Sequence, residues 1–234
     1  MDWKDRFNRH AQQFTETDFL QHVSKTVNGQ VITAEQFDAI IDSIARSLEI
    51  QPGARLLDLC CGNGVVTRRL ATHFHSVDAI DFSESLIKIA NKHNNQPSIA
   101  YHLGSIFDLG EILQSSPSVY ESICMYEALQ CFSKDELTAI LRTLRGFCGP
   151  NSVIFLGSVP DATRIWNFYN TPARRDEYYR RSAEGTEAIG TWWEKLTIEA
   201  SAVKSGFSTE FRSQPSILHT SHYRFDVLLK PIWV

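Results

Sequence analysis

The sequence predicts an α/β fold: a seven-stranded, mostly parallel sheet with helices on both faces and an antiparallel hairpin at its C-terminal end. Five short apolar runs between residues 55 and 157 alternate with segments whose apolar residues recur at helical spacing, which is typical of a parallel sheet. The first run leads into a turn with two glycines, and two more strand-like runs follow the last helical segment. The 234 residues, of which 43% are apolar, suffice to bury the core of one such domain.

Two helices are expected ahead of the first strand. In the first, Phe7, His10 and Phe14 recur at helical spacing. The second follows Thr33, and Gln36 three residues later completes a capping-box pattern. We expect the second helix to pack on the sheet. The first helix precedes a polar loop, and we expect it to lie over the ligand-binding cleft of the domain.

The remaining elements follow in a regular order. Ser133 and Glu136 form a second capping-box pattern, ahead of a helix with a stripe of leucine and isoleucine. The predicted strands cover residues 55–59, 76–81, 99–104, 122–126, 153–157, 208–212 and 223–230, and the helical segments after the first strand cover 66–74, 84–92, 133–144 and 198–204.

The overall charge argues against a nucleic acid as the main partner. The formal net charge is −4 and the pI is near 6.1, whereas phosphate binding needs a concentrated basic surface. The chain has no run of about eighteen apolar residues and begins with no apolar signal segment, so we expect neither export nor a membrane partner. The five cysteines lack paired metal-ligand spacing, so we expect no metal and reduced thiols in a cytoplasmic protein.

The rest of the chain is organised around the turn after the first strand. Gly62 and Gly64 carry no Cβ, so the backbone can approach a ligand closely, and the helix behind them presents unpaired N–H groups. The expected ligand is a nucleoside-bearing cofactor. Asp81 lies about twenty residues further on, at the end of the next strand, where a carboxylate can accept both ribose hydroxyls. A dinucleotide site would have a small residue and a glycine at the positions of Thr67 and Cys60.

Residues 57–64, which read LDLCCGNG, resemble the first motif of the class I S-adenosylmethionine-dependent methyltransferases. The match departs from the motif at Cys60, where the family usually has glycine. The resemblance implies a Rossmann-like fold, S-adenosyl-L-methionine as cofactor and S-adenosyl-L-homocysteine as product. It also implies that Asp58 holds the methionine end of the cofactor and that the turn of Cys60, Gly62 and Gly64 packs along it. The closing antiparallel pair of strands is a further resemblance, which a dinucleotide dehydrogenase would not share.

The same resemblance extends the cofactor site along the sheet. It implies that Asp81 binds the ribose, with Phe82 beside it. Ser105 stands where the family usually has an aspartate on the adenine amino group, and the backbone of Ile106 meets the adenine ring. Tyr126 ends the fourth strand, next to the loop that faces the cofactor.

The acceptor base is a separate question. Methyl transfer from a sulfonium is an in-line displacement, in which positioning and desolvation supply much of the acceleration, and a base is needed only if the acceptor must lose a proton. The family often has two histidines after the fourth strand, where this chain has Gln130 and Cys131. The candidates that border the cleft in the resembled fold are Glu127, His222, His219 and His10.

Two segments are expected to cover the site: residues 1–34 as an N-terminal helical cap and residues 160–196 as a cap or lid inserted after the fifth strand. The second segment is rich in arginine and aromatic residues, which suits a planar acceptor bearing a carboxylate or a phosphate. A solvated helix whose aromatic side chains dock on the core explains the composition equally well. The candidate cap and substrate residues are Phe7, His10, Phe14, Trp166, Tyr169, Tyr178 and Trp192.

Taken together, the sequence predicts one methyltransferase domain over residues 1–234 that methylates oxygen or nitrogen of a small molecule. The acidic balance, the aromatic cap and the lack of an appended binding domain favour a small-molecule acceptor. One alternative is a non-catalytic or partner-dependent protein with the same fold. The other is a nucleotide-dependent oxidoreductase. The patterns leave the oligomeric state open.

Overall fold

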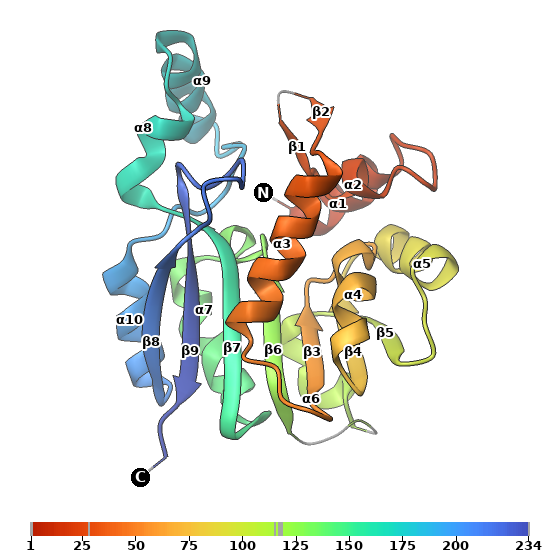
Figure 1. Cartoon of the computed structure of the whole chain (residues 1–234). Coiled ribbons are helices and arrows are strands. Elements are labelled where there is room, and N and C mark those ends of the chain that lie inside the picture. Colours follow the sequence, from red (N-terminus) through yellow and green to blue (C-terminus); the bar gives the residue numbers. More distant parts are fainter. Residues whose placement is uncertain (1, 28, 115, 117–118, 234) are drawn as a thin grey trace.

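The structure is a computed structural model that describes residues 2–27, 29–114, 116 and 119–233. At its centre lies a seven-stranded sheet with helices on both faces, and the predicted fold class is confirmed (Figure 1). In the order in which they lie side by side, the strands are β5 (Ile99–Leu103), β4 (Ser76–Asp81), β3 (Arg55–Leu59), β6 (Tyr120–Tyr126), β7 (Cys148–Pro160), β9 (Arg224–Pro231) and β8 (Phe207–Ser213).

The strand directions determine where a ligand can bind. The five strands β3 to β7 are parallel, whereas β9 runs antiparallel to β7 and to β8. From the central pair β3 and β6, the parallel strands follow the chain order outward, to β5 on one side and to β7 on the other. In such sheets the ligand crevice opens beyond the carboxyl ends of the strands at the point where the order reverses. That point lies between β3 and β6.

The two faces of the sheet bury separate hydrophobic clusters. In β3, Leu57 and Leu59 point into one cluster and Leu56 into the other, because successive side chains of a strand alternate between faces. The helices that contribute to the Leu56 cluster are α3 (Ala34–Ser47), α4 (Val65–Leu70) and α5 (Glu84–His93), and those on the opposite face are α6 (Leu109–Ile112), α7 (Lys134–Arg145) and α10 (Lys195–Lys204).

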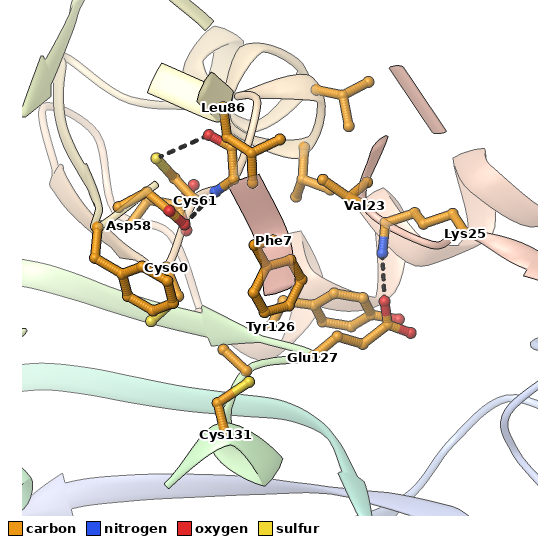
Figure 2. A pocket seen from close by; sticks show the side chains of 16 residues that line it. Phe7, Val23, Lys25, Asp58, Cys60, Cys61, Leu86, Tyr126, Glu127 and Cys131 are labelled. Carbon is orange, nitrogen blue, oxygen red and sulfur yellow. Dashed lines mark hydrogen bonds and ion pairs between the residues drawn. The ribbon is translucent and has the colours of Figure 1, made fainter. Parts of the chain in front are cut away.

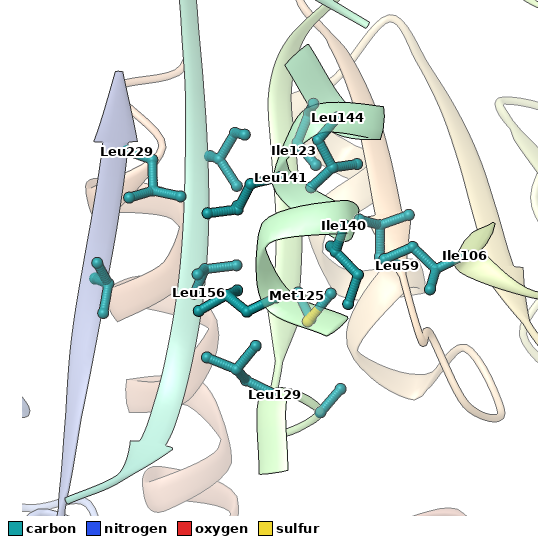
Figure 3. Packing of buried hydrophobic residues seen from close by; sticks show 14 of the residues in the cluster. Leu59, Ile106, Ile123, Met125, Leu129, Ile140, Leu141, Leu144, Leu156 and Leu229 are labelled. Atoms are coloured by element: carbon teal, nitrogen blue, oxygen red, sulfur yellow. The ribbon is translucent and has the colours of Figure 1, made fainter. Parts of the chain in front are cut away.

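Helix α7 illustrates how the sequence pattern becomes packing. Leu137, Ile140, Leu141 and Leu144 are fully buried in the same cluster as residues of β6 and β7. Figure 3 shows Leu144 beside Ile123 and Ile140 beside Leu59. Each such side chain contributes about 1.5–3 kcal/mol by leaving water. Both predicted capping boxes are present, at the start of α3 and of α7.

The N-terminal residues lie at the carboxyl end of the sheet, beside the start of α5 (Figure 1). The Asn8 side chain accepts hydrogen bonds from Ser83 Oγ at 2.7 Å and from Ser85 N at 3.2 Å, which join the first helix to α5. A small hairpin stands where the sequence predicted only a polar loop, because strands of two residues carry no periodicity. These elements are α1 (Trp3–Ala11), α2 (Phe19–His22), β1 (Thr26–Val27) and β2 (Gln30–Val31).

The segment after β7 forms short helices and then returns to the sheet. β7 is longer than predicted and ends at Pro160. The chain reaches the sheet again at Trp193, which is fully buried. The backbone N–H of Trp193 donates to Pro160 O at 2.8 Å. In Figure 1 the helices stand away from the sheet. They are α8 (Ile165–Phe168) and α9 (Pro172–Ala183); the 3-10 turns are η1 (Ala71–His73), η2 (Ile106–Asp108), η3 (Leu129–Cys131) and η4 (Ala162–Arg164).

Among the described residues, no helix combines the length and the apolar character needed to cross a membrane.

Candidate active site

The turn after β3 has the backbone conformation that glycine favours. Cys60, Gly62 and Gly64 all have positive φ, at 56°, 58° and 75°. A left-handed conformation costs a residue with a Cβ roughly 1–2 kcal/mol, so a glycine would be relaxed at position 60 and Cys60 is strained. Although Cys60 departs from the motif, its backbone adopts the left-handed conformation that a glycine would adopt there, so the turn is kept.

Close packing also excludes side chains at the two glycines. A Cβ on Gly62 would lie 2.9 Å from Val23 Cγ1, and one on Gly64 would lie 2.7 Å from Tyr101 Cζ. Val23 belongs to the segment between α2 and β1, so the N-terminal residues pack directly on the glycine turn.

Asp81, at the carboxyl end of β4, braces this turn. One carboxylate oxygen accepts the N–H of Gly62 at 2.9 Å, and the other accepts the N–H of Ser83 at 2.8 Å. Burial raises the pKa of Asp81 to about 6, although both hydrogen bonds oppose that shift. Because each oxygen of a carboxylate can accept a second hydrogen bond, Asp81 can also receive two hydroxyl groups from the cavity that it lines.

Asp58 lies beside Asp81 at the end of β3. Burial raises the pKa of Asp58 to about 7, the nearby Asp81 adds to the shift, and a hydrogen bond from Thr67 opposes it. Thr67 Oγ1 donates to Asp58 Oδ2 at 2.6 Å. In the sequence, Thr67 stands out only as a departure from a dinucleotide pattern. Its place in the structure is to orient Asp58.

A narrower recess continues from Asp81 toward the edge of the sheet. It is lined by Phe82, Ser105, Ile106 and Phe132, which together form a mostly apolar slot. Ser105 Oγ accepts the N–H of Phe107 at 3.2 Å, so this hydroxyl also caps the 3-10 turn η2.

A buried ion pair closes the other side of the cavity and was not predicted. Lys25 Nζ lies 2.6 Å from Glu127 Oε2, and only 3% of the Lys25 side chain is exposed (Figure 2). Lys25 also sits 4.7 Å from the centre of the Tyr126 ring. Burial by itself would raise the pKa of Glu127, but Lys25 and Arg224 outweigh it and lower the pKa to about 2. No sequence pattern links positions 25 and 127, which are brought together only by the fold.

Two cavities meet at this ion pair. The first, between the glycine turn and Tyr126, has a volume of about 80 Å³, and Phe7 and Val23 line it. The second has a volume of about 300 Å³ and shares Phe7, Val23, Glu127 and Cys131 with the first. The remaining residues that line the second cavity are Trp3, Arg6, His10, Ser24, Thr26, Gln130, Phe168, Ala188, Ile189, His219, Tyr223 and Arg224.

The three candidate histidines differ in burial and in whether they line the second cavity. His219 lines the second cavity, and burial lowers its pKa, so the ring is neutral at pH 7. His222 is exposed and lines neither cavity in the part of the chain that the structure describes. His10 lines the second cavity, but its Nε2 contacts Gln21 O at 2.9 Å and Ser24 Oγ at 3.1 Å.

The predicted aromatic residues of the 160–196 segment form a cluster behind the cavity wall. Phe168 and Tyr223 line the cavity itself, with ring centres 4.8 Å apart. Behind them are Tyr169, Tyr178 and Trp192, with Trp166 at the surface against Tyr178. Phe14 packs on His10 and His22 outside both cavity walls, as far as the described residues show.

Comparisons with known proteins agree with this geometry. Residues 56–151, which contain the glycine turn, Asp58, Asp81 and Glu127, match the family model described as "Methyltransferase domain". The match covers 96 of the 234 residues. The chain also resembles the magnesium protoporphyrin IX methyltransferase of Synechocystis PCC 6803, solved with bound SAH, with a TM-score of 0.64 and 15% identity over 99% of this chain and 98% of that one. A cyclopropane synthase from Mycobacterium tuberculosis superposes with a TM-score of 0.66 and 18% identity over 92% of this chain and 79% of that one. The whole chain thus has the class I methyltransferase fold.

Curated relatives match this chain over part of its length. A ubiquinone biosynthesis O-methyltransferase from Xanthomonas campestris pv. campestris is 30% identical over 121 residues, which is 51% of this chain and 48% of that protein. One of the same name from Xylella fastidiosa is 34% identical over 92 residues, or 38% of this chain and 36% of that protein. The chain therefore spans about half, or less, of the length of these relatives.

Proposed function

We propose that the protein transfers a methyl group from S-adenosylmethionine to an oxygen or nitrogen of a small molecule. The observation that carries this proposal is the pair of adjoining cavities: one lies against the glycine turn, the other is large enough for an acceptor, and they meet at Glu127 and Cys131. The domain match and the fold support it.

The residues of the first cavity suit the cofactor. Asp81 has acceptor positions for two ribose hydroxyls, and Asp58 offers a carboxyl group to the methionine end. The mostly apolar walls of the slot at Ser105 and Ile106 suit a flat ring, and the slot, of about 20 Å³, has to widen to hold it. Phe82 lies between these two regions, because it lines both of them. When bound, S-adenosylmethionine supplies an electrophilic methyl group. In this site the protein's part is to orient that group toward the second cavity and to exclude water.

The chain offers a proton acceptor for an acceptor group that must lose a proton. We assign this role to His219, which is neutral and faces the second cavity. Glu127 is poorly suited because its pKa of about 2 makes it a weak base. Cys131, at the junction, remains a thiol at neutral pH because burial raises its pKa to about 12.

Residues 1–34 and 160–196 act as caps in this proposal. Trp3, Arg6 and His10 of α1 and Ala188 and Ile189 of the second segment line the same cavity. A cavity of about 80 Å³ is smaller than the roughly 300 Å³ that small-molecule sites occupy, so Phe7 and Val23 have to move aside as the cofactor enters. All five cysteines are free, which favours a reducing, cytoplasmic location.

The test is calorimetric titration with S-adenosylhomocysteine and, under the same conditions, with NADH. We expect S-adenosylhomocysteine alone to bind, and turnover of S-adenosylmethionine with an acceptor panel to follow. Binding of NADH instead would favour an oxidoreductase, and binding of S-adenosylhomocysteine without turnover of any acceptor would favour a non-catalytic protein.

A further inference from the structure

Arg224 is a buried cation in the wall of the second cavity, close to the buried ion pair of Lys25 and Glu127. Lys25 and Arg224 both raise the positive potential at Glu127, but only Lys25 pairs with it directly. Arg224 is 6% exposed, and no carboxylate among the described residues lies within ion-pair distance of it. Burial opposes the charge of Arg224, yet Tyr223 and Glu127 nearby raise its pKa, so it remains a cation. A buried charge without a partner is costly, which points to a missing anion.

Other charged groups near Arg224 have partners of their own. Asp226, two residues along β9, accepts Ser158 N at 2.7 Å and Gln214 Nε2 at 3.0 Å. Arg6, across the cavity, donates to Ala188 O at 3.1 Å and stacks on Trp3. Asp226 is held by these neutral donors and makes no direct ion pair with Arg224 among the described residues.

Two buried nitrogens without partners belong to residues in the wall of this cavity. Arg224 Nη1 donates to Ser158 O at 2.6 Å and contacts Gln130 Oε1 at 3.4 Å, which fixes the guanidinium in place. Its Nε is buried and has no hydrogen-bond partner in the described part of the chain, and the same is true of His219 Nδ1. Unsatisfied buried donors are rare in native proteins, and a ligand is one of the ways to satisfy them.

We propose that the acceptor substrate is a carboxylic acid whose carboxylate binds to Arg224 Nε and His219 Nδ1, with its body against the rings of Phe168 and Tyr223. This inference rests on the proposed function and specifies the acceptor. His219 then donates Nδ1–H to the carboxylate and leaves Nε2 to receive a proton. Arg224 is a binding residue, and the acceptor atom points toward Glu127, where the two cavities meet.

The charge favours a carboxylate over a phosphate ester. Arg224 is a single buried cation, which a monoanion balances one to one, whereas a phosphate ester carries close to two negative charges at pH 7. Arginine can also bind the two oxygens of a carboxylate side by side. An uncharged acceptor would leave the cation unpaired.

The test uses matched probes and calorimetry in the presence of saturating S-adenosylhomocysteine. The probes are benzoate, 4-hydroxybenzoate and 3-(4-hydroxyphenyl)propanoate, each compared with its carboxamide, and phenyl phosphate. We expect at least one carboxylate to bind at least tenfold more tightly than its amide. Arg224→Gln should weaken binding of the carboxylate at least tenfold. Arg224→Lys should weaken it less, because lysine keeps the charge but not the planar set of N–H donors of the guanidinium. The exposed Arg142→Gln on α7 is the control and should change nothing.

The outcomes separate this inference from the proposed function. If S-adenosylhomocysteine fails to bind the wild-type protein, the proposed function is wrong. If it binds but no carboxylate exceeds its amide, or phenyl phosphate binds most tightly, the carboxylate assignment is wrong. If Arg224→Gln weakens binding of S-adenosylhomocysteine as much as binding of the carboxylate, Arg224 contributes to cofactor binding or to folding and not to carboxylate binding. Unchanged cofactor affinity in the variant shows that it is folded.

Discussion

The cofactor side and the acceptor side of the cleft are built in different ways. On the cofactor side, Asp58 and Asp81 bond to Thr67, Gly62 and Ser83, all within 26 residues of chain from 58 to 83. The difference between the two sides lies in sequence distance and in polar satisfaction. The proposed acceptor side brings together Lys25, Glu127, His219 and Arg224 from three distant segments. It leaves two buried nitrogens, Arg224 Nε and His219 Nδ1, without partners in the described chain. A site whose polar groups are paired within the protein is suited to one invariant cofactor. A site with unpaired polar groups indicates which groups of a ligand would pair with them.

The largest expected effect comes from breaking the buried ion pair on the acceptor side. Lys25→Met leaves Glu127 without its direct partner, and removing one member of a buried pair costs about 3–5 kcal/mol of unfolding free energy. Chemical denaturation measures the loss. Lys230→Met is the matched control, because its pair with Glu49 is about half exposed and worth about 1 kcal/mol or less. Equal losses in the two variants would show that burial of the first pair has no energetic weight.

The next effect separates the two sides by ligand. Asp81→Ala should weaken S-adenosylhomocysteine by more than tenfold, since hydrogen bonds to a charged group are worth about 1.5–3 kcal/mol each. Calorimetry measures the change, and the exposed Asp42→Ala on α3 is the control. Unchanged affinity would contradict the ribose assignment for Asp81.

The third prediction concerns pH. In the unfolded chain the Asp58 carboxyl titrates near 3.9, whereas its folded pKa is about 7. The folded state therefore binds the extra proton between these values, and the contribution of Asp58 to stability falls as pH rises from about 4 to 7. The Asp58→Asn variant has no titrating carboxyl at this position, so it lacks this fall in stability with rising pH. The stability of the variant minus that of the wild type should increase by about 1 kcal/mol or more between pH 5 and pH 8, as measured by urea unfolding at each pH.

A flat difference across that range would show that Asp58 is not a buried carboxyl of raised pKa. Because neutral Asp58 and asparagine differ little in shape, the comparison at pH 5 serves as the internal control.

The smallest effect tests the local backbone of the cofactor side. Cys60→Gly relieves a positive φ but loses a packed thiol, so we expect stability to change by less than about 1 kcal/mol and S-adenosylhomocysteine affinity to be kept. Cys60→Val should lose about 1–2 kcal/mol, because a β-branched side chain fits a left-handed backbone poorly. A valine variant as stable as the glycine variant would argue against strain at this position.

The sequence predicted the sheet, the two capping boxes and the placement of Asp81 at a strand end, because each depends on neighbours a few residues away. It missed the role of Thr67, since the position was compared only with a different cofactor motif. It proposed His219 and His222 together, and the structure distinguishes them by burial. Periodicity gives no measure of which of two nearby loop residues turns inward.

The sequence by itself therefore determined the fold and the local structure of the glycine turn, on the side proposed to bind the cofactor. Alternating apolar runs specify a parallel sheet, and the glycine turn specifies a close approach of backbone to a ligand. Only the tertiary structure decided the acceptor side. Lys25 and Glu127 are 102 positions apart and Arg224 lies 97 beyond Glu127, so their charges interact only after the caps and β9 have packed against β6 and β7. Charge pairing and burial act through space, and no local pattern along the chain records them.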